Sequence, residues 1–233
     1  METAKRVDPN ITTVAGGQHF TATAQENLET YSEIDVIIRG EGERTLVDIV
    51  RTLEENRPLS NVAGISFRHG KEVIHIPHGP LIENLDELPF PSYHFVEDHM
   101  RKYHFSMMAG VNARYALVEA SRGCPHRCTF CSQWRFWNET WRAKSPKRIV
   151  DEMEHCHREY DSRFLWLVDD NFGLGERTSE MCAEIVSRGL SDDIMWFIQA
   201  RCDDICLHKD ILPKMTKAGN IWMLTRLQTH SSK

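Results

Sequence analysis

The stretch "ASRGCPHRCTFCSQWRFW", residues 120–137, carries three of the chain's seven cysteines. They are Cys124, Cys128 and Cys131, and they fall within eight consecutive positions. The apolar run "YALVEAS" at 115–121 leads directly into them and is typical of a buried strand. A thiol cluster placed just after a strand indicates metal chemistry in a loop at the edge of a sheet.

The number of thiols restricts the kind of metal centre that this loop can hold. A structural zinc site uses four protein ligands, and His126 is the one additional ligand type inside the loop. A four-iron cluster bound by three thiolates leaves one iron open to a substrate or cofactor. We therefore predict an iron–sulfur cluster, with zinc binding and a coincidental, unliganded triplet as the alternatives.

Composition limits the class of protein. With 233 residues, 41% of them hydrophobic, the chain can bury a substantial core. Its formal net charge of -6 argues against a general nucleic-acid binder, so nucleic acid is not an expected partner. The longest apolar runs, such as "FLWLV" at 164–168, are too short to span a membrane, and no signal-peptide pattern occurs near the start. An odd number of cysteines without an export signal favours reduced thiols and a cytoplasmic location.

Downstream of the cysteines, continuous apolar runs alternate with amphipathic segments. The sequence predicts strands at 115–121, 164–172 and 194–201, and a fourth beginning at Ile221. It predicts helices that begin at Ser145 and Pro146, that run from about Thr178 to Gly189, and that run from about Lys209 to Gly219. This order predicts a partial (β/α) barrel, whose chemistry lies at the C-terminal ends of its strands, where Cys124 and Asp169 fall.

The first region has the same alternation on a smaller scale. Strand-like runs at 11–15 and 35–39 each end in glycines, and helical segments follow both. In the second helix, Leu46, Ile49, Val50 and Leu53 share one face that needs a sheet to cover. Residues 62–76 read as a hairpin turning at His69 and Gly70. We predict an α/β fold with a partial doubly wound, Rossmann-like sheet.

Two closely spaced prolines in "ENLDELPFPSYHF" interrupt regular structure between the two regions. We therefore predict a first domain at 1–80, a linker at 81–114, and a half-barrel at 115–233.

The segment "CPHRCTFC" resembles the CxxxCxxC signature of the radical S-adenosylmethionine (radical SAM) superfamily. The resemblance implies that Cys124, Cys128 and Cys131 bind a [4Fe-4S] cluster whose fourth iron binds S-adenosylmethionine. It also implies that Phe130, the aromatic residue before the last cysteine, lies against the adenine. The alternative for Phe130 is ordinary packing within the loop.

In that family the second barrel strand ends in a polar motif that binds the ammonium group of S-adenosylmethionine. The matching segment here, "LWLVDDNF", makes Asp169, Asp170 and Asn171 the candidates, although the family's usual glycine pair is absent. The alternative is that Asp170 or Asn171 caps the following turn. Arg201, at the end of the third predicted strand, is expected to contact a cofactor or substrate, or to form a salt bridge.

Three further stretches, "AGGQHFTA", "DVIIRGEGERT" and "LDELPFPSY", resemble the cobalamin-binding members of the superfamily. The resemblance implies that two glycine loops lie near the cobalamin, with plain turns as the alternative. The implied contacts are Gly16, Gly17, His19, Gly40, Glu41 and Gly42. The family's DxHxxG pattern and the later barrel strands are absent from the sequence, so we expect a fragment or truncated form.

The resemblance implies radical methyl transfer to carbon, or a radical cyclisation or rearrangement, on a small-molecule substrate. It also implies an electron donor such as flavodoxin or ferredoxin. One alternative is a methylthiotransferase-like enzyme, which shares the cysteine triplet. The other is a non-catalytic iron–sulfur or zinc binding module left by truncation.

Overall fold

The computed structural model describes residues 1–100, 102–106 and 112–225, which form two compact units. The first unit comprises Met1–Glu83 with Arg135–Asn138, and the second comprises Asn84–Trp134 with Glu139–Lys233. Part of the predicted linker, at 101 and 107–111, and the polar tail at 226–233 lie outside the described residues.

The second unit is built on a five-stranded sheet with the strand order β11-β10-β9-β6-β5. Its strands are β5 (His104–Ser106), β6 (Asn112–Val118), β9 (Phe164–Leu167), β10 (Met195–Gln199) and β11 (Asn220–Leu224). The last four strands are parallel, and β5 pairs with β6 in the antiparallel direction. The predicted strands and their parallel order are therefore confirmed, including the fourth strand near Ile221.

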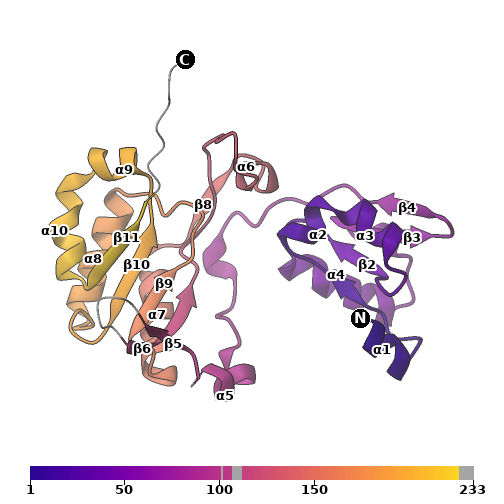
Figure 1. The fold of residues 1–233 in the computed structure, drawn as a ribbon, viewed down its shortest axis with the longest axis horizontal. Helices are drawn as coiled ribbons and strands as arrows, with labels where there is room; N and C mark the ends of the chain where they lie inside the picture. The colour runs from indigo at the N-terminus through magenta and orange to yellow at the C-terminus, as the bar shows by residue number, and fades with distance from the viewer. Residues whose placement is uncertain (101, 107–111, 226–233) are drawn as a thin grey trace. The chain divides into compact units, whose positions relative to one another are not determined.

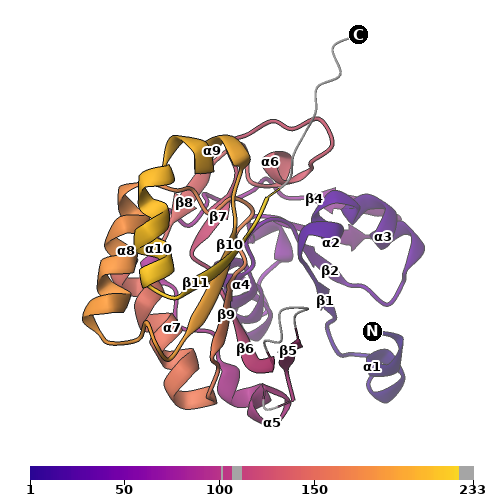
Figure 2. The ribbon, with the colours of Figure 1, turned by 60° about the vertical axis from the view of Figure 1, so that its left-hand side comes forward.

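Helices cover one face of this sheet, as Figures 1 and 2 show for α7, α8 and α10. The helices of this unit are α5 (Glu97–Met100), α7 (Pro146–Tyr160), α8 (Glu176–Ser187), α9 (Cys202–Leu207) and α10 (Leu212–Lys217). Apolar side chains from α7 and α8, such as Ile149 and Met181, are buried against alternate strand residues such as Leu165 and Ile198. The result is a curled half-barrel with a single apolar core on its helical side.

Helix α7 begins as its sequence predicts. The Ser145 hydroxyl accepts a hydrogen bond from the Arg148 backbone N–H at 3.2 Å, and Pro146 occupies the first helical position. Together they satisfy one free donor of the first turn and preset the backbone angle there. Buried Lys144, just before the cap, pairs with buried Glu152 of α7 at 2.8 Å, which fixes the start of the helix.

Aromatic rings line the opposite face of the sheet. Phe164 stacks on Phe105 with 4.4 Å between the ring centroids, and on Phe197 with 5.3 Å between them. Trp166 also stacks on Phe197, with a centroid distance of 5.0 Å. Because side chains alternate along a strand, these rings point away from the helix-covered core. The concave face therefore has an aromatic floor below the C-terminal strand ends.

Several elements of this unit are not predicted from the sequence. Between β6 and α7 the chain forms a two-stranded ribbon of β7 (Ser121–Gly123) and β8 (Trp141–Ala143), with the cysteines in its loop. The short helix α6 (Gln133–Phe136) follows the cysteines, and its last two residues are grouped with the first unit. Helix α9 follows β10 directly. In the predicted linker, 3-10 turns lie at Leu85–Glu87 and Tyr93–Val96, and Arg148 donates to the Leu88 carbonyl.

The first unit is a four-stranded sheet with the order β1-β2-β3-β4. Its strands are β1 (Val14–Ala15), β2 (Val36–Ile38), β3 (Ile65–His69) and β4 (Glu72–His75), and its helices are α1 (Glu2–Val7), α2 (Gln18–Ala22), α3 (Ala24–Thr30) and α4 (Glu43–Glu54). Strands β1 and β2 are parallel, and the predicted hairpin is confirmed as the antiparallel pair β3 and β4.

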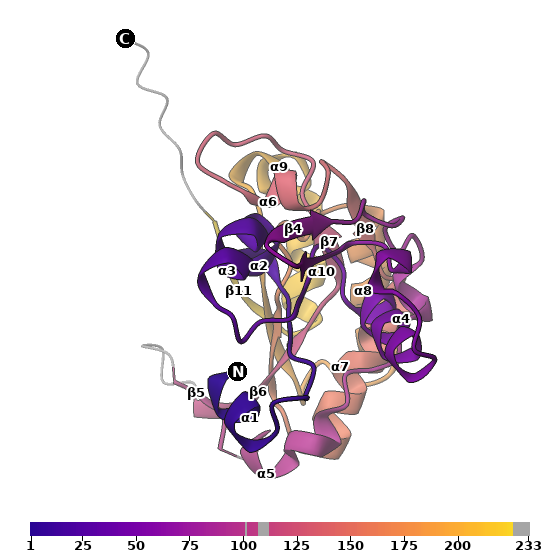
Figure 3. The ribbon, with the colours of Figure 1, turned by 90° about the vertical axis from the view of Figure 1, so that its right-hand side faces the viewer.

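Helices α3 and α4 lie on opposite sides of this small sheet (Figure 3). Leu28 of α3 packs with Ile37, whereas Ile49 of α4 packs with Val36 and Ile38 on the other face. This alternation is the doubly wound arrangement that the sequence predicts.

The predicted apolar face of α4 is only partly buried. Ile49 is 1% exposed, but Leu46, Val50 and Leu53 are 38–46% exposed. The buried side of the helix is therefore the one that holds Ile49 and Thr52, and Ile49 packs into the core of Val36, Ile38 and Ile65.

Candidate functional site

The cysteine loop connects β7 to β8 at the C-terminal end of the first parallel strand. Cys124, Cys128 and Cys131 are half-buried and form no disulfide. A tight turn brings the last two together, because the Cys131 N–H donates to the Cys128 carbonyl at 3.1 Å. The indole of Trp134 donates to the same carbonyl at 3.3 Å.

Cys124 lies in surroundings that disfavour a free thiolate. Burial is the largest cause and raises the pKa of its thiol, a backbone hydrogen bond from His126 lowers it, and nearby Cys131, Asp170 and Cys128 raise it. A bound metal centre reverses this effect, because its positive charge stabilises the deprotonated ligand.

The chemistry of the donor set, not a preformed ligand geometry, fits a cluster. Among the residues that the structure describes, no group of three or more His, Cys, Asp or Glu side chains is arranged to hold a metal ion. The loop nevertheless carries three cysteines, the thiolate donors that a [4Fe-4S] cluster uses.

Asp169, at the end of β9, holds the entrance to the cysteine loop. Its Oδ1 accepts hydrogen bonds from the backbone N–H groups of Ala120 at 2.8 Å and Ser121 at 2.9 Å. The side chain is almost fully enclosed, and burial raises its pKa to about 6. Its Oδ2 has no hydrogen-bond partner among the described residues.

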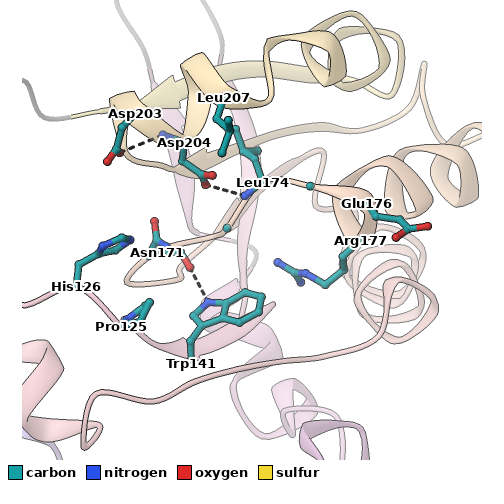
Figure 4. Close-up of a pocket in the computed structure, with 12 residues that line it drawn as sticks. Pro125, His126, Trp141, Asn171, Leu174, Glu176, Arg177, Asp203, Asp204 and Leu207 are labelled. Carbon is teal, nitrogen blue, oxygen red and sulfur yellow. Dashed lines mark hydrogen bonds between the residues drawn. The ribbon is translucent and has the colours of Figure 1, made fainter.

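Asn171 lies at the wall of a cavity of about 460 Å³ beside the cysteine loop (Figure 4). Its Oδ1 is buried and has no hydrogen-bond partner in the described part of the chain. Its backbone carbonyl accepts from the Trp141 indole at 3.0 Å, which fixes the position of the residue. A buried acceptor without a partner fits a ligand that brings an N–H or O–H donor.

Arg177 and Asp204, which also line the cavity, are residues that the sequence does not single out. The guanidinium carbon of Arg177 lies over the Trp141 ring, 5.3 Å from its centroid. The Nη2 of Arg177 donates a hydrogen bond to the Phe172 carbonyl at 2.6 Å. Asp204 of α9 accepts a hydrogen bond from the Leu174 N–H at 2.8 Å. His126 of the cysteine loop also lines the cavity (Figure 4). Position in the first turn of the helices that follow β9 and β10 is the signal that could have indicated Arg177 and Asp204.

Arg201, the residue just before α9, joins the third strand end to the cysteine loop. Its Nη1 lies 3.7 Å from the Sγ of Cys128. Its Nε and Nη2 donate to the two carboxylate oxygens of Asp203, at 3.0 and 2.7 Å. The hydrogen bond to Asp203 is the main cause of the raised pKa of the Arg201 guanidinium.

Phe130 and Asp170 are exposed at the same end of the sheet. The Phe130 side chain, between Cys128 and Cys131 in sequence, is 59% exposed. Asp170 follows buried Asp169 and lies close enough to Cys124 to raise the pKa of that thiol. The second unit therefore gathers all the site residues predicted for the barrel at its C-terminal strand ends.

In the first unit, both glycine loops lie at one end of the parallel pair β1 and β2. Thr21 joins them, because its hydroxyl donates to the Gly17 carbonyl at 2.8 Å and accepts from the Gly40 N–H at 3.0 Å. Gly17 has φ +95, and no atom lies within 4 Å of the place where its Cβ would be. This open backbone fits the close approach of a large flat ligand.

The other predicted contacts of this unit lie around the same loops. His19 is exposed on α2, and Gly16 precedes that helix. Glu41 accepts from the Ile82 N–H at 2.7 Å, so its carboxylate ties the loop to the end of the unit. Gly42 is the N-cap residue that directly precedes α4.

No helix within the described ranges has the length and apolar character needed to cross a membrane.

The two units define a class of protein: a doubly wound domain followed by a half-barrel with a three-cysteine loop after its first parallel strand. Comparison with known proteins agrees with this class. Residues 118–233 match the model of the radical SAM superfamily, and residues 1–50 match that of the B12 binding domain.

Similar curated proteins include an anaerobic magnesium-protoporphyrin IX monomethyl ester cyclase of Cereibacter sphaeroides, 34% identical over 94% of this chain and 35% of its own length. The cobalamin-dependent radical SAM methyltransferase TokK of Streptomyces tokunonensis is 31% identical over 78% of this chain and 27% of its own length. The chain spans about 35–41% of the length of the first relatives that it matches.

Solved structures share the fold. The cobalamin-dependent S-adenosylmethionine radical enzyme OxsB, with aqua-cobalamin bound, superposes with a TM-score of 0.74 at 21% identity, over 99% of this chain and 33% of that one. The methyltransferase TsrM from Kitasatospora setae gives a TM-score of 0.73 at 14% identity, over 91% of this chain and 40% of that one. The chain belongs to the radical SAM superfamily, among the members that carry a B12-binding domain.

Proposed function

We propose that this chain is the cofactor-binding portion of a cobalamin-dependent radical SAM enzyme. The observation that carries the proposal is the three-cysteine loop directly after the first parallel strand, in a chain that also matches the B12-binding model. When bound, the reduced cluster supplies the electron that cleaves S-adenosylmethionine and starts radical chemistry.

The residues of the second unit receive separate roles in this proposal. Cys124, Cys128 and Cys131 ligate the cluster, and Phe130 lies against the adenine. The buried acceptor Asn171 Oδ1 and the exposed carboxylate of Asp170 hold the ammonium group of S-adenosylmethionine through charge-assisted hydrogen bonds. Asp169 contributes mainly by holding Ala120 and Ser121, which fixes the entrance to the cysteine loop.

The first unit binds cobalamin through its glycine loops. Gly17 presents open backbone beside exposed Gly16, and Gly40 and Gly42 flank Glu41 in the neighbouring loop. His19 is placed on the exposed side of α2, where it reaches the edge of such a ligand. In domain terms, residues 1–80 are the C-terminal part of the cobalamin-binding domain, 81–114 the linker, and 115–233 the first half of the radical barrel.

The reaction is methyl transfer to carbon, or a cyclisation or rearrangement, on a small molecule. Relatives named as methyltransferases and as a cyclase support both reaction types. An electron donor such as flavodoxin or ferredoxin reduces the cluster, and a cytoplasmic location keeps the cysteines reduced.

The test begins with anaerobic purification and reconstitution with iron and sulfide. We expect a reduced [4Fe-4S] signal in the electron paramagnetic resonance spectrum that shifts when S-adenosylmethionine is added. Cobalamin binding is followed by its visible absorption. Zinc in place of iron, or a cluster whose spectrum ignores S-adenosylmethionine, would overturn the proposal in favour of a binding module.

A cysteine replacement ties the cluster to its ligands. Cys128→Ala is expected to lose most of the bound iron, because one of three thiolates is removed. The matched control is Cys206→Ala, which removes an exposed thiol on α9 and should keep the full iron content. Equal iron content in the two variants would show that the cysteine loop is not the cluster site.

A further inference from the structure

Arg201 is held in a fixed orientation beside the cysteine loop. Two N–H donors of its guanidinium, on Nε and Nη2, bind the two carboxylate oxygens of Asp203. This two-point arrangement fixes the orientation of an arginine side chain. That pair occupies Nε and Nη2 and leaves Nη1 directed at Cys128, whose sulfur lies 3.7 Å away. The Arg201 side chain is 35% exposed, so it is partly shielded from water.

Cys128 is fixed from its backbone as well as from its sulfur. Its carbonyl accepts from the Cys131 N–H and from the Trp134 indole. The contact from Arg201 comes from a different part of the chain, 73 positions away. The middle cysteine of the triplet is therefore held both by its own loop and by the end of the third strand.

We propose that Arg201 donates a hydrogen bond to the Cys128 sulfur when that residue is a cluster ligand, and that it thereby raises the reduction potential of the cluster. Asp203 acts through Arg201 as a positioning residue. The inference rests on the proposed function, since it requires a cluster on the cysteine loop.

The physical reason is the charge that reduction adds. One electron enters the cluster, so the reduced state carries one more negative charge than the oxidised state. A cation beside one thiolate stabilises the reduced state more, and a hydrogen bond to sulfur withdraws electron density from the iron. Outer-sphere donors of this kind tune metal sites without binding the metal themselves.

The experiment is a redox titration of the full chain after anaerobic reconstitution, without S-adenosylmethionine, with dithionite as reductant and the paramagnetic signal as readout. Arg201→Gln is expected to shift the midpoint to a more negative value. Arg201→Lys keeps the charge but loses the paired N–H donors, and Asp203→Glu keeps the carboxylate charge but displaces the guanidinium, so both should give smaller shifts in the same direction. Arg158→Gln, which removes an exposed arginine of α7, is the matched control and should leave the midpoint unchanged.

Each outcome decides between the proposals. If the wild-type chain takes up no cluster, the proposed function fails and this inference fails with it. If the wild type forms a cluster that responds to S-adenosylmethionine but Arg201→Gln has an unchanged midpoint, only this inference is overturned. Weaker binding of S-adenosylmethionine at an unchanged midpoint would assign Arg201 to that ligand instead. Should Arg201→Gln fail to load, the midpoints of Arg201→Lys and Asp203→Glu decide by the same criterion.

Discussion

The candidate site of the second unit is held by side-chain contacts, whereas that of the first unit is mostly exposed backbone. In the second unit, side chains from one element hold another: Asp169 binds the backbone at Ala120 and Ser121, and Arg201 contacts Cys128. In the first unit the candidate surface is mostly backbone, formed by two exposed or half-exposed glycine loops that Thr21 links.

The difference follows from the ligands that each unit is proposed to bind. Thiolates must meet a small cluster from defined directions, so the loop that carries them needs buried anchors. A large flat ligand needs room and smooth backbone more than particular side chains. Substitutions should therefore cost more stability at the anchors of the second unit than in the loops of the first.

The largest effect is expected at the buried carboxylate. Asp169→Ala leaves two buried N–H donors without an acceptor, at about 1–3 kcal/mol each, so the free energy of unfolding should fall by about 2–6 kcal/mol. Asp169→Asn keeps an acceptor oxygen, so it should lower the free energy of unfolding by clearly less than Asp169→Ala does. Urea unfolding measures both, and equal losses in the two variants would contradict an anchoring role.

Sequence reasoning found Asp169 by its place at a strand end, but not the reason for its burial. Its hydrogen-bond partners lie 48 and 49 positions away, which no local pattern reveals. The same limit explains the missed helix α9, whose six residues "CDDICL" carry too short an apolar pattern to be read. By contrast, the cap at Ser145 and Pro146 is local, and its prediction is confirmed.

The buried face of α4 shows a further limit. Its apolar residues share one helix face in the sequence, but burial depends on how far the sheet extends beneath them. The described sheet of the first unit covers Ile49 and leaves Leu46 and Val50 exposed. The cysteine loop was readable because three thiols at fixed spacing are rare, whereas glycine pairs also occur in ordinary turns.

The second largest effect is a pH dependence of stability. The pKa of Asp169 is raised from 3.8 to about 6, mainly by burial, which corresponds to about 3 kcal/mol. Because the folded state binds this proton more tightly, the contribution is fully present below pH 3.8 and is lost as the pH rises through about 6.

Comparison with the Asp169→Asn variant separates the pH dependence due to Asp169 from that of the other titrating groups. The free energy of unfolding of the wild type minus that of Asp169→Asn should become more favourable to the wild type as the pH falls from 7 to 4.5. Parallel pH profiles for the two proteins would show that Asp169 titrates normally, and would weaken the contrast between the two units.

The smallest effect belongs to the first unit, where two adjacent glycines make a matched pair. Gly17 has φ +95 and ψ 180, a region that other residues rarely adopt, so Gly17→Ala should destabilise the unit by about 1–3 kcal/mol. Since nothing lies within 4 Å of the new Cβ, this cost arises from the backbone and not from a clash.

Gly16 lacks the positive φ, and its added Cβ would meet Ile38 at an ordinary 3.6 Å. Gly16→Ala should therefore leave stability nearly unchanged, and denaturant unfolding of the two variants measures the difference. If these loops face cobalamin, both added methyl groups should weaken its binding, because each fills space that the ligand needs. Weaker binding in Gly16→Ala without a loss of stability would separate a ligand surface from a plain turn, whereas unchanged binding in both variants would assign these glycines to the turn alone.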